Sequence, residues 1–225
     1  MHETTWNYLD NLKPASEIPI DWNATGYTSE AFIREVEHEA FAGWSGDLED
    51  EEEVAVMARL LAVRPGAKLL DVACGYGRHA LIFARKHAMK VTGVDIATAL
   101  VDAANRRARQ TGVSASFIAG HGRDLPWRNA FDHAIVAYNS FSIFGPEDAP
   151  RVLRGIRSAL TERGRLFLDL DNKPHLLRYG GCHRNWYACH GSLTLQDVHF
   201  HYDISVEVTR DVTIHSDSRG PDEFI

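Results

Sequence analysis

The stretch that decides the fold reads Leu69-Leu70-Asp71-Val72-Ala73-Cys74-Gly75-Tyr76-Gly77-Arg78-His79-Ala80. Its apolar first half predicts a short buried strand over residues 69–73, and residues 78–86 continue as a helix. A strand that passes through glycines into a helix presents backbone N–H groups to a ligand at close range. The spacing Gly75-x-Gly77-x-x-Ala80 also matches the dinucleotide fingerprint, although that spacing alone is a weak indication. The stretch therefore predicts a ligand-binding loop between a strand and a helix.

More strand-then-helix units follow this stretch. Short apolar runs predict further strands at 91–95, 115–118, 132–138 and 165–170. Helical spacing predicts helices at 97–110 and 146–160. Alternating strands and helices imply an α/β fold with a doubly wound, mostly parallel sheet that helices cover on both faces through right-handed crossovers.

The predicted organisation has three parts. Residues 1–45 form an aromatic-rich N-terminal helical cap, residues 46–172 form the binding core, and residues 173–225 form an antiparallel hairpin with a tail. Within the cap, residues 29–42 have helical spacing. The aromatic residues of the cap suit either a lid that excludes water from a cationic ligand or a small satellite core; they are Trp6, Tyr8, Trp22, Tyr27 and Trp44.

An acidic run at residues 49–53 begins the core. Its carboxylates suit the N-terminus of a helix, where they interact favourably with the helix dipole. The apolar series that would form the buried face of this helix is Val54, Met57, Ala58, Leu60 and Leu61. The pair Pro65-Gly66 ends the helix.

Composition excludes several classes of protein. A chain of 225 residues with 44% hydrophobic and 24% charged residues is long and apolar enough to bury a full core, so a largely disordered chain is excluded. No apolar run approaches the length of a membrane span, and no secretory signal is expected from the first residues. A net charge of −7 without a long basic run makes a nucleic-acid partner a poor expectation. Three cysteines favour a reducing, cytoplasmic location over a disulfide scaffold.

Two acids flank the predicted loop. Asp95 ends the second strand, 18 residues after Gly77, where a carboxylate can accept hydrogen bonds from both ribose hydroxyls of an adenosine ligand. Two ligands are compatible with this pattern: a nicotinamide dinucleotide and S-adenosylmethionine. Asp71 favours the second, because a carboxylate two residues before the loop would repel a pyrophosphate but tolerates an ammonium and a sulfonium.

Residues 54–172 resemble the class I S-adenosylmethionine-dependent methyltransferases of the small-molecule branch. The blocks that carry the resemblance are LLDVACGYGRHA (69–80), VTGVDIA (91–97), FIAGHGRDLPW (117–127), FDHAIVAYNSF (131–141) and LTERGRLFLDLDN (160–172). Five blocks in the expected order and at the expected spacing are far more specific than the loop alone. The resemblance implies a Rossmann-like methyltransferase core with S-adenosyl-L-methionine as its cofactor.

The resemblance also implies a set of cofactor-binding residues. They are Asp71, Ala73, Gly75, Gly77, Asp95, Ile96, His121, Gly122 and Asn139. Ala73 stands where the family pattern usually has its first glycine, which is a mild departure. His121 stands where the family usually has an acid that accepts from the adenine amino group. A neutral imidazole nitrogen could accept that bond, or the Gly122 amide could carry adenine recognition alone. Asp124 is interpreted as a turn-forming residue.

The segment Tyr138-Asn139-Ser140-Phe141 ends the fourth strand and is expected to face the transferable methyl group. It differs from the Asn-Pro-Pro-aromatic motif that methylates planar nitrogens. The predicted function is therefore methyl transfer to a nitrogen or oxygen of a small metabolite. The alternatives are a non-catalytic cofactor-binding or scaffold protein and an NAD-dependent oxidoreductase.

Histidines gather after the fifth strand, and His183, His199 and His201 are the candidates for a general base. His199 and His201 share one face of a strand, so they could hold a metal with Asp203, although solvent-facing histidines are the simpler interpretation. The pairs Cys182-His183 and Cys189-His190 lie too far apart for a structural zinc site, and no metal is predicted.

The end of the chain departs most from the family pattern. Alternating apolar residues predict an antiparallel hairpin of 193–201 with 205–215, and the tail 216–225 has turn composition without a core pattern. The family's last helix and strands have no counterpart in this sequence, so either the hairpin substitutes for those strands or the chain is truncated. The hairpin is expected to cover the edge of strand five or to pair with a second subunit. An uncovered edge attracts other chains, so a homodimer is also predicted.

Overall fold

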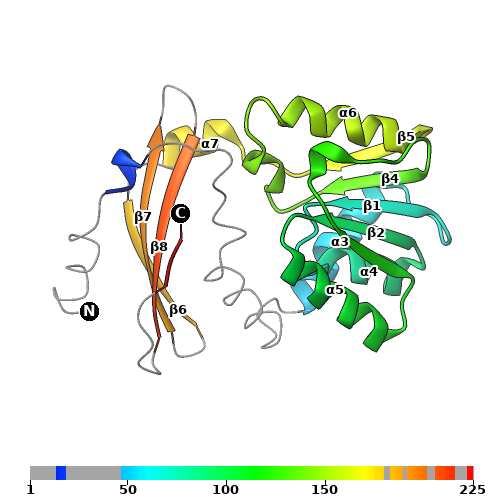
Figure 1. Cartoon of the computed structure of the whole chain (residues 1–225), viewed down its shortest axis with the longest axis horizontal. Coiled ribbons are helices and arrows are strands. Elements are labelled where there is room, and N and C mark those ends of the chain that lie inside the picture. Colours follow the sequence, from blue (N-terminus) through cyan, green and yellow to red (C-terminus); the bar gives the residue numbers. More distant parts are fainter. Residues whose placement is uncertain are drawn as a thin grey trace. The chain divides into compact units, whose positions relative to one another are not determined.

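The structure is a computed structural model, and it describes residues 14–18, 47–179, 183–189, 192–201, 206–215 and 222–224. Contacts divide the chain into two compact units: residues 33–170, and residues 1–32 together with 171–225. Each unit is described by itself (Figure 1). The helix predicted over 29–42 and the aromatic residues of the predicted cap lie outside the described residues.

The unit of residues 33–170 contains a five-stranded parallel sheet in the order β3-β2-β1-β4-β5. Its strands are β1 (Lys68–Val72), β2 (Lys90–Asp95), β3 (Ala115–Ala119), β4 (Phe131–Val136) and β5 (Leu160–Leu168). Its helices are α3 (Asp47–Leu61), α4 (Arg78–His87), α5 (Thr98–Thr111) and α6 (Ala149–Ala159), with 3-10 turns η3 (Gly122–Asp124) and η4 (Ser140–Ile143). The predicted doubly wound α/β fold is confirmed. Because β2 and β3 lie on one side of β1 and β4 and β5 on the other, the strand order reverses between β1 and β4.

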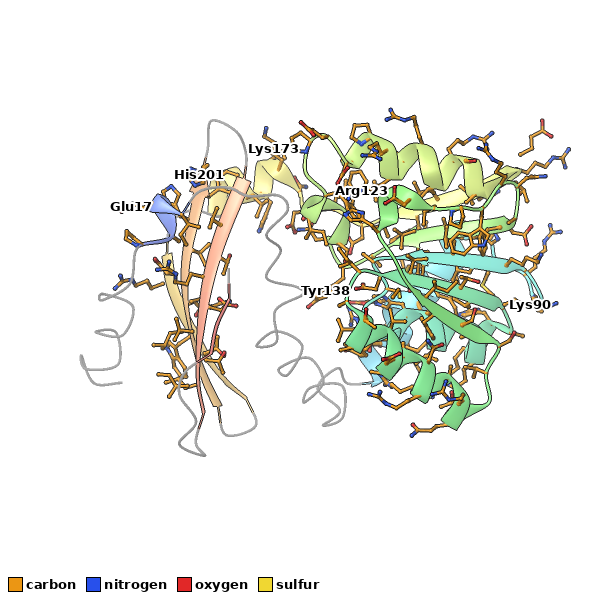
Figure 2. All side chains as sticks on the ribbon, viewed as in Figure 1. Glu17, Lys90, Arg123, Tyr138, Lys173 and His201 are labelled. Carbon is orange, nitrogen blue, oxygen red and sulfur yellow. The ribbon has the colours of Figure 1, made fainter. Side chains whose placement is uncertain are left out.

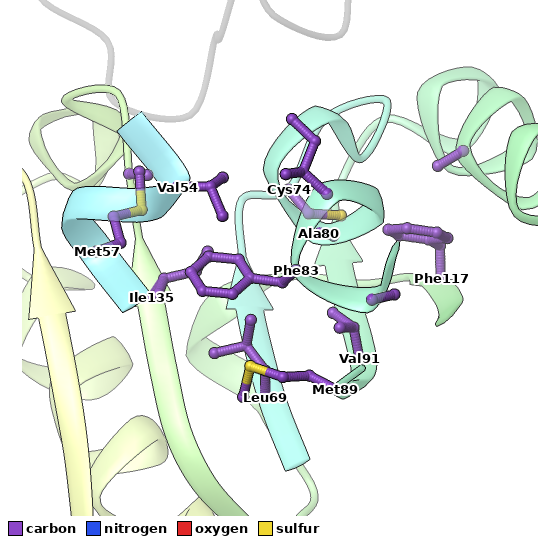
Figure 3. Packing of buried hydrophobic residues seen from close by; sticks show 14 of the residues in the cluster. Val54, Met57, Leu69, Cys74, Ala80, Phe83, Met89, Val91, Phe117 and Ile135 are labelled. Carbon is purple, nitrogen blue, oxygen red and sulfur yellow. The ribbon is translucent and has the colours of Figure 1, made fainter. Parts of the chain in front are cut away.

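Two apolar clusters hold this sheet between its helices. The first contains Phe83 and Met89 with Leu69 of β1, together with residues of α3 and α5 (Figure 3). The second contains Leu70 of β1 together with Val152 and Ile156 of α6. Neighbouring residues of β1 thus enter different clusters, as the two-residue period of a strand requires when both faces are buried.

Several predicted boundaries are wrong by a few residues. Strand β4 ends at Val136, because Tyr138 and Asn139 have positive φ angles of 57° and 54° that break the extended chain. Strand β5 begins at Leu160, before the predicted start at residue 165, and its register against β4 is irregular before Arg165. Helix α6 begins at Ala149, after the turn η4.

One predicted core residue of α3 is also wrong. Leu60 is 59% exposed, whereas Val54, Met57 and Leu61 are buried. Leu60 lies outside the inward stripe of this helix, to which the buried apolar residues at 54, 57, 58 and 61 belong.

The second unit contains a four-stranded antiparallel sheet in the order β6-β7-β8-β9. Its strands are β6 (His183–Cys189), β7 (Ser192–His201), β8 (Val206–His215) and β9 (Asp222–Phe224), and a helix α7 (Lys173–Tyr179) precedes them. The predicted hairpin is confirmed as β7 and β8. A short turn η1 (Ala15–Glu17) joins this unit through a hydrogen bond of 2.9 Å from the Ala15 N–H to Asp197 Oδ2.

Two expectations for this region are corrected. The hairpin does not substitute for missing strands of the parallel sheet: β7 pairs with β6 and β8, and within the described ranges β5 pairs only with β4. Both edges of β7 are thus already hydrogen-bonded inside the antiparallel sheet. The tail is not merely a turn, because residues 222–224 pair with β8 as strand β9. No described helix has the length and apolar character that a membrane span needs.

Candidate functional site

The strand order reverses between β1 and β4, and open α/β sheets bind ligands at such a reversal. The loops that follow these two strands are therefore the expected ligand-binding segments. After β1 the chain turns with positive φ at Ala73 (59°), Gly75 (52°) and Gly77 (79°). A Cβ at Gly77 would lie 2.7 Å from the Phe117 ring, so only glycine fits there. A Cβ at Gly75 would meet no heavy atom within 4 Å, so this part of the loop faces open space. The loop therefore leaves room for a ligand against its backbone.

Asp95 ends β2 and holds the loop. Its Oδ2 accepts the Gly75 N–H at 2.7 Å, and its Oδ1 accepts the Ala97 N–H at 2.9 Å. Burial raises the pKa of Asp95, while these N–H groups act to lower it. Because a carboxylate oxygen can accept more than one hydrogen bond, Asp95 can also accept from a ligand.

Asp71 lies within β1 and is buried, with 3% of its surface exposed. Burial raises the pKa of Asp71 to about 8; the charge of Asp95 adds to this rise and Arg78 opposes it. The carboxyl therefore holds its proton at neutral pH in the unliganded chain. A protonated Asp71 does not repel a pyrophosphate as the charged carboxylate expected from the sequence would. A cationic ligand would ionise Asp71, whereas an anionic one would leave it neutral.

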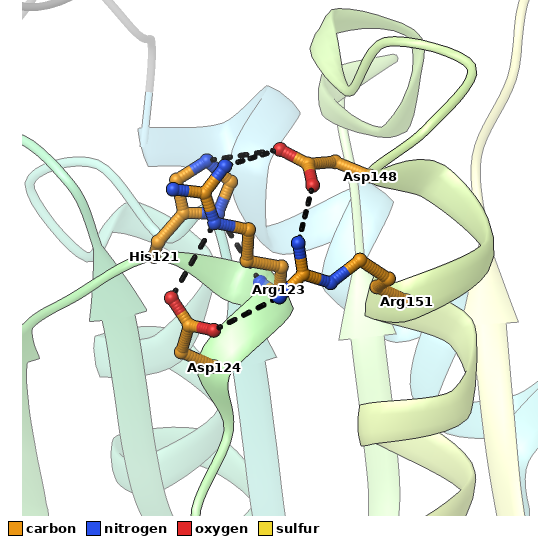
Figure 4. A network of polar contacts seen from close by, with 5 residues as sticks. All are labelled: His121, Arg123, Asp124, Asp148 and Arg151. Carbon is orange, nitrogen blue, oxygen red and sulfur yellow. Dashed lines mark hydrogen bonds and ion pairs between the residues drawn. The ribbon is translucent and has the colours of Figure 1, made fainter.

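His121 precedes η3 and is held by two neighbours (Figure 4). Its Nδ1 accepts the Arg123 N–H at 3.2 Å, and its Nε2 lies 3.8 Å from Asp148 Oδ2. Burial and the charge of Arg123 lower the pKa of His121, which leaves the ring neutral with its proton on Nε2. Neither nitrogen then remains as an acceptor, which favours the Gly122 amide for adenine recognition. Gly122 is buried, and a Cβ there would lie 2.9 Å from Val72.

A network of charges links η3 to the start of α6 (Figure 4). Arg123 NH1 donates to Asp148 Oδ2 at 2.7 Å, and its Nε donates to Asp124 Oδ2 at 3.4 Å. Arg151 of α6 lies 3.5 Å from Asp148 and 3.8 Å from Asp124. Asp124 thus lies in an ion-pair network of the turn, in agreement with its interpretation as a turn residue.

The other side of the site is formed by the chain after β4. The Tyr138 N–H donates to Asp169 Oδ2 at 2.9 Å, and the Tyr138 side chain is exposed. The Asn139 carbonyl accepts the Ser142 N–H at 3.0 Å, which fixes η4. Ile96, next to Asp95, is 46% exposed and offers an apolar surface beside the ribose-binding acid.

Sequence reasoning missed a cluster between α3 and α4. Arg78 NH1 pairs with Asp50, Arg78 NH2 lies 3.5 Å from Glu53, and His79 Nε2 lies 2.7 Å from Glu53. The acidic run was interpreted only as a partner of the helix dipole, but three of its members pair with α4. The Arg-His pair directly after Gly77 was the one sign available in the sequence, and its partners could not be read because they lie more than twenty residues away.

Asp50, Glu53 and His79 are also the group of three possible metal ligands that the described part of the chain contains. Arg78 already pairs with both carboxylates, and its positive charge opposes a metal ion. This cluster is therefore better described as an ion-pair network.

The candidate general bases lie in the other unit. The rings of His199 and His201 are 4.5 Å apart on one face of β7, and His201 Nε2 is buried without a hydrogen-bond partner among the described residues. His183 belongs to β6, and its side chain lies outside the described residues, as do Cys182, His190 and Asp203. The structure brings the predicted cofactor residues together at the ends of β1, β2, β3 and β4, and it pairs two of the three histidines.

The strand order, the glycine loop after β1 and the acid after β2 define the Rossmann-like fold of S-adenosylmethionine-dependent methyltransferases. Residues 69–164 match the model of a methyltransferase domain. The resemblance that the sequence blocks predict is therefore confirmed, and the match supports S-adenosylmethionine as the cofactor.

Solved structures share this fold. The CcbJ methyltransferase from Streptomyces caelestis has a TM-score of 0.70, with 91% of this chain and 80% of that chain covered at 18% identity. CalS10, an amino pentose methyltransferase from Micromonospora echinaspora solved with S-adenosylmethionine bound, has a TM-score of 0.62, with 84% and 78% covered at 23% identity.

A curated relative aligns with the core. The 2-phytyl-1,4-naphtoquinone methyltransferase of Synechococcus elongatus is 32% identical over 118 residues, which are 51% of this chain and 50% of the relative. The chain spans about half the length, or less, of the curated relatives that it matches.

Proposed function

We propose that this chain transfers the methyl group of S-adenosylmethionine to a nitrogen or oxygen of a small metabolite. The observation that carries the proposal is the arrangement of Asp71, Gly75 and Asp95: a buried carboxyl and a second acid lie on either side of a loop that opens to solvent space. The methyltransferase-domain match over residues 69–164 supports it.

The residues of the site fit this cofactor. The open backbone at Gly75 leaves space for the methionine half, and the carboxylate oxygens of Asp95 suit the ribose hydroxyls. Asp71 suits the ammonium group, because a nearby cation stabilises its ionised form. Ile96 and the Gly122 amide would contact the adenine base. Asn139 and Ala73 would complete the site at the ends of β4 and β1.

Bound S-adenosylmethionine supplies an electrophilic methyl group on a positively charged sulfur. The acceptor's lone pair forms the new bond to the methyl carbon, while the carbon–sulfur bond breaks with its electron pair going to sulfur. The task of the protein is to align the two reactants, to exclude water and, for a hydroxyl acceptor, to remove a proton. His183, His199 and His201 remain the proposed candidates for that base.

A small-molecule acceptor is supported by the net charge of −7, which disfavours a phosphate backbone, and by relatives named for small acceptors. An amine needs only to arrive deprotonated, whereas a hydroxyl needs a base. A histidine base is therefore needed for an oxygen acceptor but not for a nitrogen acceptor. His201→Gln and His199→Gln would slow methylation of a hydroxyl far more than that of an amine.

Calorimetry with S-adenosylhomocysteine and, separately, with NAD tests the cofactor. We expect binding of S-adenosylhomocysteine; binding of NAD alone would overturn the proposal in favour of an oxidoreductase. Incubation with labelled S-adenosylmethionine and metabolite extracts, followed by mass spectrometry, tests the transfer. Tight cofactor binding without a labelled product from any extract would favour the non-catalytic alternative.

We also propose that the chain forms a homodimer and that it is cytoplasmic. Light scattering of the whole chain tests the homodimer, and a monomer at all protein concentrations would contradict it. The cytoplasmic location rests on cysteine usage alone, and cell fractionation tests it.

A further inference from the structure

Arg78 occupies the first position of α4, directly after the loop. Its NH1 pairs with Asp50 of α3, whose side chain is only 4% exposed, and its NH2 lies 3.5 Å from Glu53 Oε2. Glu53 also lies 2.7 Å from His79 Nε2. Burial lowers the pKa of His79, so the two carboxylates are balanced mainly by the guanidinium. The guanidinium is thus held in place from the α3 side, and its charge is compensated there.

The same guanidinium stacks on Tyr138. Its Cζ lies 4.3 Å from the centroid of the Tyr138 ring, which is the geometry of a cation–π contact. The backbone of Tyr138 is fixed by the hydrogen bond to Asp169 and has a φ of 57°, which is unusual for a tyrosine. Tyr138 is nevertheless 63% exposed, and Figure 2 shows it at the edge of the parallel unit. An anchored aromatic ring with so much exposed surface is available to a ligand.

The two residues come from opposite sides of the strand-order reversal. Arg78 follows β1 and Tyr138 follows β4, so their contact spans the position at which open α/β sheets bind ligands. A free arginine at this position would repel a cationic ligand. Because Asp50 and Glu53 compensate the charge of Arg78, the pair presents mainly the electron-rich ring of Tyr138 instead.

We propose that Arg78 is a positioning residue that, braced by Asp50 and Glu53, fixes the Tyr138 ring at the methyl end of the cofactor site, where the ring favours the positively charged methyl donor over its neutral product. This inference rests on the proposed function. The sulfonium loses its charge when the methyl group leaves, so a cation–π contact holds the donor and releases the product.

Two probes test this without knowledge of the acceptor. S-adenosylhomocysteine has a neutral sulfur, whereas sinefungin carries a charged amine on the carbon that replaces the methylated sulfur. We expect Tyr138→Leu to lower the affinity for sinefungin about twofold to tenfold relative to that for S-adenosylhomocysteine, since a cation–π contact contributes about 0.5–1.4 kcal/mol. Tyr138→Phe retains the ring and should retain the ratio of the two affinities.

Arg78→Lys keeps the charge and loses the planar stacking group. We expect this variant to lower the affinity for sinefungin relative to that for S-adenosylhomocysteine. The double variant Arg78→Lys/Tyr138→Leu should lower this ratio no further than Tyr138→Leu alone, because Arg78 acts through the ring. Arg85→Lys is the matched control: Arg85 lies on the same helix and pairs with Glu51 of α3 at 2.9 Å, but far along α4 from the loop. This variant should leave the ratio unchanged.

An unchanged ratio in Tyr138→Leu, or effects of Arg78→Lys and Tyr138→Leu that simply add, would overturn the inference. Failure of the unaltered chain to bind S-adenosylhomocysteine would instead contradict the proposed function, so the two failures are distinguishable. Tyr138 is exposed, so its replacement is not expected to unfold the chain.

Discussion

The two sheets hold notable polar side chains in different surroundings. In the parallel unit, Asp71 and Asp95 lie at the carboxyl ends of β1 and β2, beside the loop that a ligand would occupy. In the antiparallel unit, Thr194, Thr213 and Arg210 are buried on β7 and β8, the two central strands of that sheet. Polar burial at strand ends prepares a binding site, whereas polar burial in the middle of a sheet must be satisfied within the protein itself. Asp71 and Asp95 are thus available to the proposed cofactor, whereas the polar residues of β7 and β8 lie within their sheet.

The largest expected effect concerns the apolar cores. Phe83 is fully buried in the parallel unit, and Phe83→Ala should lower the free energy of unfolding by about 3–5 kcal/mol through lost burial and a cavity. Leu195 is also fully buried, but its cluster contains only Val212 as a second buried member among the described residues. Leu195→Ala should therefore cost less, about 2–3 kcal/mol, because a thin cluster relaxes more easily.

Chemical denaturation measures the free energy of unfolding of both variants. Calorimetry with S-adenosylhomocysteine measures whether each variant still binds this ligand. We expect Leu195→Ala to bind this ligand normally when folded. Equal losses of stability for the two variants would show that the antiparallel sheet buries a core as large as that of the parallel sheet.

The next effect concerns Asp95. Replacement of its carboxylate removes two proposed ribose hydrogen bonds and the bonds to the Gly75 and Ala97 N–H groups, so Asp95→Ala should weaken S-adenosylhomocysteine binding by about 2–4 kcal/mol. Asp95→Asn should share most of this loss, because its amide group would face one of the two N–H donors. Asp102→Ala, on the exposed face of α5, is the control and should bind normally. Normal affinity in Asp95→Ala would remove this residue from the site.

The protonation of Asp71 should make the stability of the folded chain depend on pH. Its pKa is about 8 in the folded chain and 3.8 as an ordinary carboxyl, so the folded state binds more protons between these values. Stability should therefore fall as the pH rises from about 4 to about 8, by up to about 1.4 kcal/mol per pH unit. Asp71→Asn should flatten this dependence, and unfolding in denaturant at a series of pH values measures it.

Binding should show the linked effect. The ligand's ammonium stabilises ionised Asp71, so complex formation near pH 7 should release a proton, which Asp71→Asn should abolish. Calorimetry in buffers of different ionisation enthalpy detects the proton. Asp95 and Arg78 are the charged groups that face Asp71, and an equal proton release in Asp71→Asn would assign the effect to Asp95 instead.

The same contrast explains what the sequence could predict. The parallel unit could be predicted because each strand is a short apolar run and the glycine loop lies directly after its strand. Short sequence patterns therefore predict both the strands and the proposed cofactor-binding residues. The Arg78 cluster could not, since it depends on the packing of α3 against α4. Strand β9 was missed because a three-residue strand in a polar tail has no period of its own, and its pairing comes from β8.

The smallest expected effect concerns the middle of the antiparallel sheet. Thr194 of β7 and Thr213 of β8 are directly opposite and buried, and their hydroxyl oxygens lie 3.0 Å apart. Thr194→Val should lower the free energy of unfolding by about 1 kcal/mol, because it leaves the Thr213 hydroxyl buried without this partner. The double variant Thr194→Val/Thr213→Val should recover most of that loss, since two apolar groups of the same shape need no hydrogen bond. Thermal unfolding of the single and double variants measures the coupling. Purely additive losses would show that each hydroxyl is satisfied independently, and any change in S-adenosylhomocysteine affinity would contradict the assignment of this polar pair to the sheet alone.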